Sequence, residues 1–276
     1  MSSTDAERGK VIFVGAGPGA PDLITVRGAR VIAEADIIIW ASSLVSPQIV
    51  ADHKPGAVLV DSASASLEDI EPLYVRARDE GLVVARVHTG DPGIYGATAE
   101  QRDQCRRIGI DFETIPGVSA FSAAAAAAEV EITLPEVAQS LILTRLEGGR
   151  TPMPPREKVR EFARHGTTMA LYLSAARNRV LQEELLAGGY PPDTPVILGH
   201  KVSWPDEEIV RCRLDDLSAA MKDRHWWKHT VILVGPALAD APVEKRSRLY
   251  HPGFRHEYRR AEPTAAADLR EKGARA

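Results

Sequence analysis

Short apolar runs alternate with amphipathic segments along the first half of the chain. The runs have the length and the Val and Ile content of buried strands, and they lie at residues 10–14, 37–41, 57–61, 82–87 and 110–115. The segments between and after them carry apolar residues at helical spacing, and they lie at residues 26–35, 67–80, 97–108 and 120–128. Strands that alternate with helices in this way predict an α/β domain with a mostly parallel sheet.

The second half repeats this alternation with one difference. Strands are predicted at residues 140–146, 168–173, 196–202, 209–214 and 230–234, and helices at residues 156–165 and 178–187. The segment 203–208 between two of these strands is too short for a crossover helix, so the two strands are expected to form an antiparallel hairpin. The pattern therefore predicts two α/β domains, the first with a mostly parallel sheet and the second with a mixed sheet.

The same pattern suggests how the chain is divided. We expect a disordered lead at residues 1–9, an N-terminal domain at 10–120, a C-terminal domain at 121–240 and a basic tail at 241–276. The net charge of the whole chain is −4, but residues 243–276 hold nine Lys/Arg against five Asp/Glu, which is +4 and leaves −8 for the rest. A chain of this overall charge is not expected to bind nucleic acid.

Composition places the chain among ordinary soluble proteins. Of its 276 residues, 44% are hydrophobic and 26% are charged. The first ten residues are polar and no apolar run is long enough to span a bilayer, so neither a signal peptide nor a membrane segment is expected. The two cysteines, Cys105 and Cys212, are far apart and lack metal-ligand spacing, so we expect reduced thiols, no metal site and a cytoplasmic location.

The loop from His88 to Gly96 is the strongest candidate for a binding site. Its sequence, HTGDPGIYG, joins a predicted buried strand to a predicted helix. In open α/β sheets, ligands bind outside the carboxyl ends of the strands, and Gly90, Gly93 and Gly96 would let the backbone approach a ligand closely. A tight turn without a ligand would use the same residue types, so both interpretations stay open.

A second glycine-rich loop follows the first strand. The order Gly15-Ala-Gly-Pro-Gly19 resembles the phosphate fingerprint of dinucleotide-binding folds. Pro18 and Pro21 interrupt the loop, however, and no acidic residue follows the second strand at residues 37–41. An NAD site is therefore disfavoured.

Four motifs in this order resemble the tetrapyrrole (corrin/porphyrin) methyltransferase family. They are VGAGPGAPDLIT at 14–25, GDPGIYG at 90–96, PGVSA at 116–120 and MALYLS at 169–174. The resemblance covers about residues 10–240. Further stretches at 42–47, 61–64, 134–136, 143–145, 189–195 and 203–207 resemble one branch of the family, whose members methylate carbon 11 of precorrin-4 in cobalamin biosynthesis.

The resemblance implies S-adenosyl-L-methionine (SAM) as the methyl donor, a cofactor cleft between the two domains and a homodimer. Carried over by motif, the cofactor contacts fall on Pro18, Thr89, Gly90, Asp91, Ile94, Ser119, Ala120, Leu173, His200 and Thr230, with the weakest match at the last two. The branch-specific stretches place the tetrapyrrole substrate against Ser43, Asp61, Arg145 and Trp204. Because the substrate is rich in carboxylates, arginines such as Arg27, Arg145 and Arg150 are candidate partners.

Methyl transfer from a sulfonium to an electron-rich carbon depends mostly on positioning. A base that removes a substrate proton could also take part, but no residue of the sequence is a good candidate for it. Alternatives remain open: a cobalt-containing precorrin-4, uroporphyrinogen III, diphthine on a protein, a ribosomal RNA ribose, a nucleotide-binding oxidoreductase, or a binding module without activity.

Overall fold

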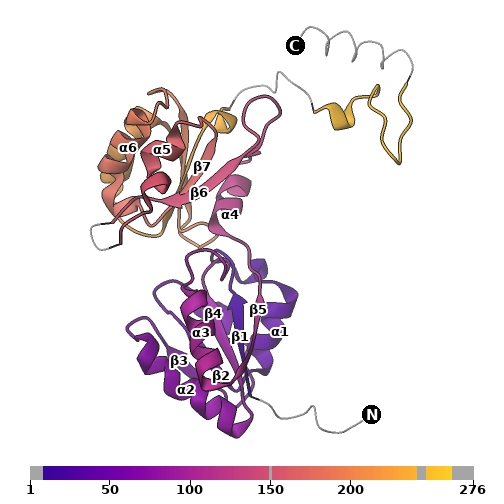
Figure 1. Ribbon diagram of the computed structural model, residues 1–276, viewed down its shortest axis with the longest axis vertical. Helices are drawn as coiled ribbons and strands as arrows, with labels where there is room; N and C mark the ends of the chain where they lie inside the picture. Colours follow the sequence, from indigo (N-terminus) through magenta and orange to yellow (C-terminus); the bar gives the residue numbers. More distant parts are fainter. Residues whose placement is uncertain (1–8, 149–150, 241–246, 263–276) are drawn as a thin grey trace.

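The computed structural model describes residues 9–148, 151–240 and 247–262. Two α/β domains follow one another along the chain, and Figure 1 shows the N-terminal domain in indigo and purple below the C-terminal domain in magenta and orange. The predicted lead at 1–9 lies outside the described residues except for Gly9, which is buried. Within the described residues, no helix is both long and apolar enough to cross a membrane.

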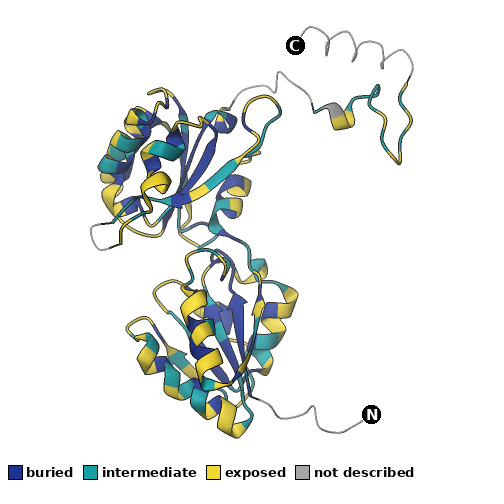
Figure 2. Ribbon diagram, in the orientation of Figure 1, coloured by how far each residue is buried: buried dark blue, intermediate teal, exposed yellow. Residues whose placement is uncertain are grey.

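A parallel five-stranded sheet forms the centre of the N-terminal domain. Its elements are β1 (Lys10–Gly15), α1 (Val26–Glu34), β2 (Ile37–Trp40), β3 (Val58–Asp61), α2 (Leu67–Glu80), β4 (Val83–His88), α3 (Thr98–Ile108) and β5 (Asp111–Ile115). The strand order is β3-β2-β4-β1-β5, and every pair is parallel, as the sequence predicts. Figure 2 shows the central strands β1, β2 and β4 as the buried layer between helices whose outer faces are exposed.

The two faces of this sheet carry separate apolar cores. Ile32 of α1 packs with Val14 and Ile38 on one face. Ile70 and Tyr74 of α2 and Cys105 of α3 pack with Phe13 and Ile37 on the other face. The helical spacing of Leu67, Ile70, Leu73 and Ala77 predicts one buried side of α2, and the structure adds Tyr74, which is fully buried.

The arrangement of the helices creates a switch point between β1 and β4. These strands are neighbours, with Gly15 in register with His88. The chain leaves β1 for α1 on one face, and it leaves β4 for α3 on the other face. Loops that diverge from adjacent carboxyl ends open a crevice, which is where α/β sheets bind ligands.

A mixed sheet forms the centre of the C-terminal domain. Its elements are α4 (Ala120–Ala127), β6 (Leu141–Arg145), α5 (Val159–Ala163), β7 (Thr168–Tyr172), α6 (Asn178–Ala187), β8 (Pro195–His200), β9 (Glu208–Arg213), α7 (Leu217–Asp223) and β10 (Thr230–Val234). The strand order is β6-β7-β10-β8-β9. Only β6 and β7 pair in parallel, and β8 and β9 form the predicted antiparallel hairpin.

Helix α4 packs on the second sheet. Its buried face consists of Ala123, Ala124 and Ala125, and Gly199 of β8 leaves space only for such small side chains, because a Cβ there would lie 3.0 Å from that of Ala124. The alanine-rich composition therefore permits close packing on a strand. We propose the boundary between the domains near residue 120 for the same reason.

Three local predictions need correction. The helix predicted at residues 156–165 is shorter, because Pro155–Glu157 forms a 3-10 turn before α5 and Gly166 turns the chain with φ +60°. Helix α7 was not predicted, since only Leu217 and Met221 mark its buried face. A serine directly before a predicted helix is an expected N-cap, and Ser119 has that position before α4, but its side chain makes no capping hydrogen bond.

Candidate functional site

Three loops of the N-terminal domain meet at glycines. A Cβ on Gly15 would lie 2.5 Å from the Gly117 nitrogen, and a Cβ on Gly117 would overlap the Gly90 carbonyl oxygen. Gly17 and Gly90 exchange two backbone hydrogen bonds, with Gly17 N to Gly90 O at 3.2 Å and Gly90 N to Gly17 O at 2.7 Å. The loops after β1, β4 and β5 therefore touch backbone to backbone at the switch point, which only glycine permits.

Asp91 fastens two of these loops. Its Oδ1 accepts a hydrogen bond from Gly93 N at 2.7 Å, and its Oδ2 accepts one from Gly117 N at 2.9 Å. Charge-assisted bonds of this kind are among the stronger ones in proteins. Asp91, predicted as a cofactor contact, thus also holds the 88–96 loop against the 116–120 loop.

The remaining predicted cofactor contacts of the N-terminal half lie around this junction. Gly90, with φ +62°, lies against the backbone of Ser119 and Ala120. Pro18 is buried, Ile94 is half-buried and Thr89 is exposed on the same loop as Gly90. The structure therefore brings together loops that are about a hundred residues apart in the sequence.

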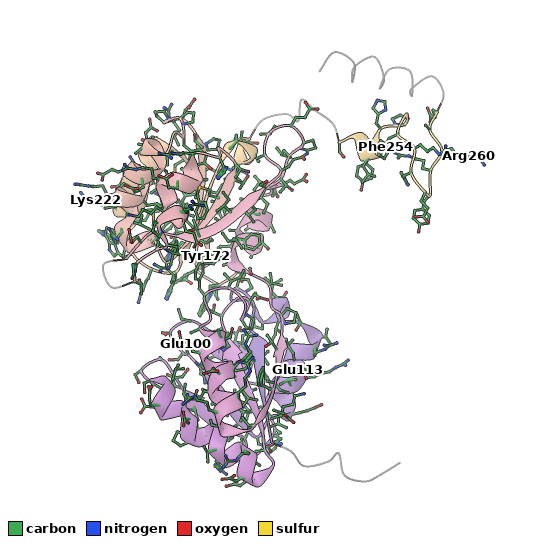
Figure 3. The ribbon with its side chains drawn as sticks, viewed as in Figure 1. Glu100, Glu113, Tyr172, Lys222, Phe254 and Arg260 are labelled. Carbon is green, nitrogen blue, oxygen red and sulfur yellow. The ribbon has the colours of Figure 1, made fainter. Side chains whose placement is uncertain are left out.

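The C-terminal domain adds exposed apolar and aromatic groups at the end of β7. Leu173 is 74% exposed and has φ +52°, a conformation that non-glycine residues rarely adopt. Tyr172, before it, lies 5.6 Å from the ring of Tyr95 in the N-terminal domain, and its hydroxyl accepts a hydrogen bond from Phe121 N at 3.0 Å. Figure 3 shows Tyr172 at the edge of the C-terminal domain that faces the N-terminal domain. Burial raises the pKa of Tyr172 to about 12, so its hydroxyl stays protonated.

A turn of the C-terminal domain docks on the loop after β1. Trp204 Nε1 donates to the Pro18 carbonyl oxygen at 3.0 Å, and Ala20 N donates to Ser203 Oγ at 2.9 Å. Gly19 leaves the space that the Trp204 ring fills, since a Cβ there would lie 2.5 Å from the indole nitrogen. Trp204, predicted as a substrate contact, therefore joins the two domains beside predicted cofactor contact Pro18.

His200 and Thr230 lie next to each other beyond this turn. His200 Nδ1 is 2.9 Å from Thr230 Oγ1, and the Thr230 hydroxyl donates to the Lys228 carbonyl oxygen at 3.1 Å. Because that hydroxyl proton is used, the His200 Nδ1 donates and its Nε2 is left as an acceptor when the ring is neutral. Burial lowers the pKa of His200, which favours the neutral ring, and Trp226 stacks on it at 4.6 Å.

Ser43 and Asp61, predicted as substrate contacts, lie where β2 and β3 end. The Asp61 carboxylate accepts hydrogen bonds from the backbone and hydroxyl of Ser42 and from Ala63 N. These bonds lower the pKa of Asp61, the largest effect being that of the Ser42 hydroxyl. Burial lowers the pKa of His229, whose hydrogen bond with the Ser43 backbone links the C-terminal domain to this loop.

Arg145 is engaged with its own loop. Its guanidinium donates to the carbonyl oxygens of Thr151 at 3.2 Å and Pro152 at 3.3 Å. A cavity of about 610 Å³ opens beside this loop, lined by Leu146, Glu147, Gly148, Pro152, Lys158, Val159, Arg177, Val180 and Glu184. Arg145 also acts electrostatically on Tyr95, so it lies toward the junction. Candidate Arg150 lies outside the described residues.

Burial shifts the pKa values of the two cysteines and of His88. Burial raises the pKa of both Cys105 and Cys212 to about 11, so both are protonated near neutral pH. Burial, assisted by Arg86, lowers the pKa of His88 to about 3, and its Nε2 is buried without a hydrogen-bond partner. No cluster of three or more His, Cys, Asp or Glu suited to a metal occurs in the described ranges.

Several groups at the junction were not predicted from the sequence. Tyr95, Tyr172, Ser203 and His229 connect the domains, and Gly15 and Gly117 set how closely the loops approach. The only available signal was their position inside or beside the glycine-rich motifs. The positive φ values of Tyr95, Ser203 and His229, and the contacts of the whole set, depend on which loops become neighbours.

The fold and this junction define a two-domain α/β protein whose glycine-lined loops meet at the switch point of its first sheet. The chain matches the family model for Tetrapyrrole (Corrin/Porphyrin) Methylases over residues 10–218. It belongs to that family, as the sequence motifs predicted, and it is a methyltransferase.

Individual relatives are similar over most of their length. The cobalt-precorrin-4 C(11)-methyltransferase of Methanocaldococcus jannaschii is 47% identical over 91% of this chain and 96% of its own. The precorrin-4 C(11)-methyltransferase of Pseudomonas aeruginosa is 46% identical over 91% of this chain and 99% of its own.

Two solved structures have the same fold. A cobalt precorrin-4 methyltransferase superposes with a TM-score of 0.81 at 45% identity, covering 83% of this chain and 96% of its own. The uroporphyrin-III C-methyltransferase of Thermus thermophilus, solved with S-adenosylhomocysteine, superposes with a TM-score of 0.68 at 25% identity, covering 83% of this chain and 99% of its own. The predicted pair of α/β domains is confirmed.

Proposed function

We propose that this protein transfers the methyl group of SAM to carbon 11 of precorrin-4. The identity of 46–47% over 91% of the chain with enzymes named for that reaction carries the proposal. Those names include both a metal-free and a cobalt-containing substrate, so the reaction is proposed for the precorrin-4 macrocycle in either form.

SAM fits the switch point of the N-terminal sheet. Contacts at Gly15, Gly90 and Gly117 hold three loops together backbone to backbone, which gathers the predicted cofactor contacts of the N-terminal domain, and exposed Leu173 lies at the end of a strand of the other domain. Pro18, Thr89, Asp91, Ile94, Ser119 and Ala120 would hold the cofactor on one side, and Leu173, His200 and Thr230 on the other. When bound, SAM supplies a methyl group on a positively charged sulfonium.

The contribution of the chain to the reaction is positioning. The carbon–sulfur bond breaks while a carbon–carbon bond forms at the macrocycle, so the donor and acceptor must be held in line. Backbone contacts between the loops, the Asp91 clamp and the Trp204 link to Pro18 make the junction stiff. A catalytic base is not assigned.

The substrate would lie beside this junction against Ser43, Asp61, Arg145 and Trp204. Asp61 already accepts three hydrogen bonds, so its role there is to fix the Ser42–Ser43 loop and not to bind a carboxylate. Arg145 holds the loop at 146–152 and acts on Tyr95, which makes it a candidate partner for the substrate carboxylates.

We further infer a homodimer located in the cytoplasm that acts on a free tetrapyrrole and not on nucleic acid or membrane. The family resemblance and the net charge of −4 support this. Light scattering after size exclusion measures the mass directly, and a monomer at micromolar concentration would contradict the dimer.

The activity test uses labelled SAM with precorrin-4, cobalt-precorrin-4 and uroporphyrinogen III in parallel. The expected product carries one new methyl group, which NMR places on carbon 11. A methyl group on another carbon would contradict the proposed methylation at carbon 11. Turnover of uroporphyrinogen III alone would contradict precorrin-4 as the substrate. Calorimetric titration with SAM and with NAD tests the cofactor independently, and we expect binding of SAM only.

A further inference from the structure

The guanidinium of Arg86 lies under the 88–96 loop without an acidic partner. Arg86 is in β4, and burial lowers its pKa. Its Nε donates to Gln101 Oε1 at 2.9 Å, and its Nη1 donates to Ser62 Oγ at 2.8 Å and to the Ile39 carbonyl oxygen at 3.4 Å. In the part of the chain that the structure describes, it forms no ion pair. A half-buried cation that bonds only to neutral groups lacks the usual charged partner, so such a residue calls for a functional explanation.

The bond from Arg86 fixes the orientation of the Gln101 amide. Arginine only donates hydrogen bonds, so the oxygen of that amide must face the guanidinium. The nitrogen of the amide then faces the cofactor loop, where Nε2 donates to the Gly96 carbonyl oxygen at 3.2 Å and to the Ala97 carbonyl oxygen at 3.4 Å. Gln101 is 2% exposed, so water does not compete for these bonds.

The segment that receives these bonds has an unfavourable backbone. Tyr95 has φ +54° and Ala97 has φ +50°, on either side of Gly96. Ala97 is also the N-cap of α3 and provides no side-chain cap. Non-glycine residues keep such conformations only when their surroundings hold them. Besides Gln101, the bond from Thr98 Oγ1 to the Pro92 carbonyl oxygen at 3.0 Å fastens this segment.

We propose that Arg86 and Gln101 are positioning residues for methyl transfer: Arg86 orients Gln101, and Gln101 holds the 95–97 backbone so that the cofactor loop and Tyr95 keep their places at the junction. Tyr95 contacts Tyr172 of the other domain, whose hydroxyl bonds to Phe121 N next to Ser119 and Ala120. The hydrogen bonds of Arg86 and Gln101 therefore affect both sides of the proposed SAM site. This inference rests on the proposed function, because it assumes that SAM binds against this loop.

Helix α3 provides a matched control. Gln104, like Gln101, is 2% exposed, but its Nε2 donates to the Leu67 carbonyl oxygen and to Glu71 on α2, away from the loop. Gln101→Met and Gln104→Met remove comparable buried hydrogen bonds from one helix. Gln101→Glu separates the two functions of Gln101, since a carboxylate still accepts from Arg86 but cannot donate to the carbonyl oxygens of Gly96 and Ala97.

The experiment measures thermal unfolding and SAM affinity of the three variants and the wild type by calorimetry, and the KM for SAM where turnover allows. We expect Gln101→Met and Gln101→Glu to weaken SAM binding about tenfold, and Gln104→Met to lower the melting temperature while leaving SAM affinity within about twofold of wild type. Wild-type SAM affinity in both Gln101 variants, or an equal loss of SAM affinity in Gln104→Met, would overturn the proposed role of Arg86 and Gln101. Failure of the wild type to bind SAM would instead overturn the proposed function.

Discussion

The two domains contribute to the junction in different ways. In the N-terminal domain all strands are parallel, so the loops after β1, β4 and β5 leave from one edge and meet at Gly15, Gly90 and Gly117. In the C-terminal domain only β6 and β7 are parallel. Its contributions come instead from non-glycine residues with positive φ, namely Leu173, Lys201, Ser203 and His229.

The two domains therefore form the junction by different means, one through backbone and the other through side chains. A parallel sheet gathers backbone at one edge, and glycine lets that backbone form a surface without side chains. A mixed sheet has fewer loops at any one edge, so single side chains such as Tyr172 and Trp204 make the contacts with the other domain. The glycine contacts determine how closely the loops approach, and the side chains determine what the second domain adds to the site.

Of the changes that test this difference between the domains, a methyl group added at Gly117 should have the largest effect on stability and SAM binding. Gly117→Ala places a Cβ against the Gly90 carbonyl oxygen and 2.8 Å from Gly15 Cα, so backbone has to move. We expect unfolding free energy to fall by about 3 kcal/mol and SAM binding to be lost. Gly56→Ala is the control: its φ is +84° but nothing lies within 4 Å, so only backbone strain of about 1 kcal/mol is expected. Urea unfolding measures the unfolding free energy of both variants. Equal losses of unfolding free energy would show that the close contact of Gly117 with Gly15 and Gly90 does not matter for stability.

The second prediction concerns pH and His88 at the end of β4. Its folded pKa of about 3 lies below the usual value of 6.5, so below pH 6.5 the unfolded chain takes up a proton that the folded chain does not. Stability should therefore fall as the pH falls from about 6.5 toward 3, by at most about 1.4 kcal/mol per pH unit from this group.

Replacement of the histidine tests this directly. His88→Gln should flatten the dependence of the unfolding free energy on pH between pH 4 and 6. The comparison needs urea titrations at several pH values for each variant. Parallel curves for wild type and His88→Gln would show that His88 is not neutral when buried.

The link between the domains should contribute less. Trp204→Phe keeps an aromatic ring against Gly19 but removes the bond from Nε1 to the Pro18 carbonyl oxygen. We expect a loss of about 1 kcal/mol in unfolding free energy and a weaker affinity for SAM. Trp227→Phe, at a position that is 46% exposed, is the control and should change neither quantity. A Trp204→Phe variant with wild-type affinity would mean that the docked turn does not support the cofactor loop.

The smallest effect should come from the backbone strain at Leu173. At φ +52° glycine is favoured over alanine, so Leu173→Gly should be more stable than Leu173→Ala by about 0.5–1 kcal/mol, although both lose the side chain at the proposed SAM site. Leu143, inside β6, is the matched control, and there glycine should be the less stable of the two. The same sign at both positions, measured by thermal unfolding, would contradict the proposed strain.

The order of the elements and the loops that carry the site followed from the sequence. Alternating apolar runs and helical periodicity are local properties, since each element must bury one face or stripe. They placed the strands of both sheets to within a few residues, and the short 203–208 connection predicted the one hairpin. The VGAGPG, Gly-Asp-Pro and Pro-Gly-Val-Ser motifs fall on the three loops of the switch point, and the motifs together predicted the family.

Only the tertiary structure decided which of these loops touch. Alternating strands and helices are compatible with many strand orders, and the contact of Gly15 with Gly117 exists because β1 lies between β4 and β5. The exposure of Leu173, the pairing of Tyr95 with Tyr172 and the docking of Trp204 on Gly19 depend in turn on how the second sheet meets that edge. Positive φ at a leucine or a tyrosine leaves no trace in the sequence, because long-range contacts hold it in place and no local preference favours it.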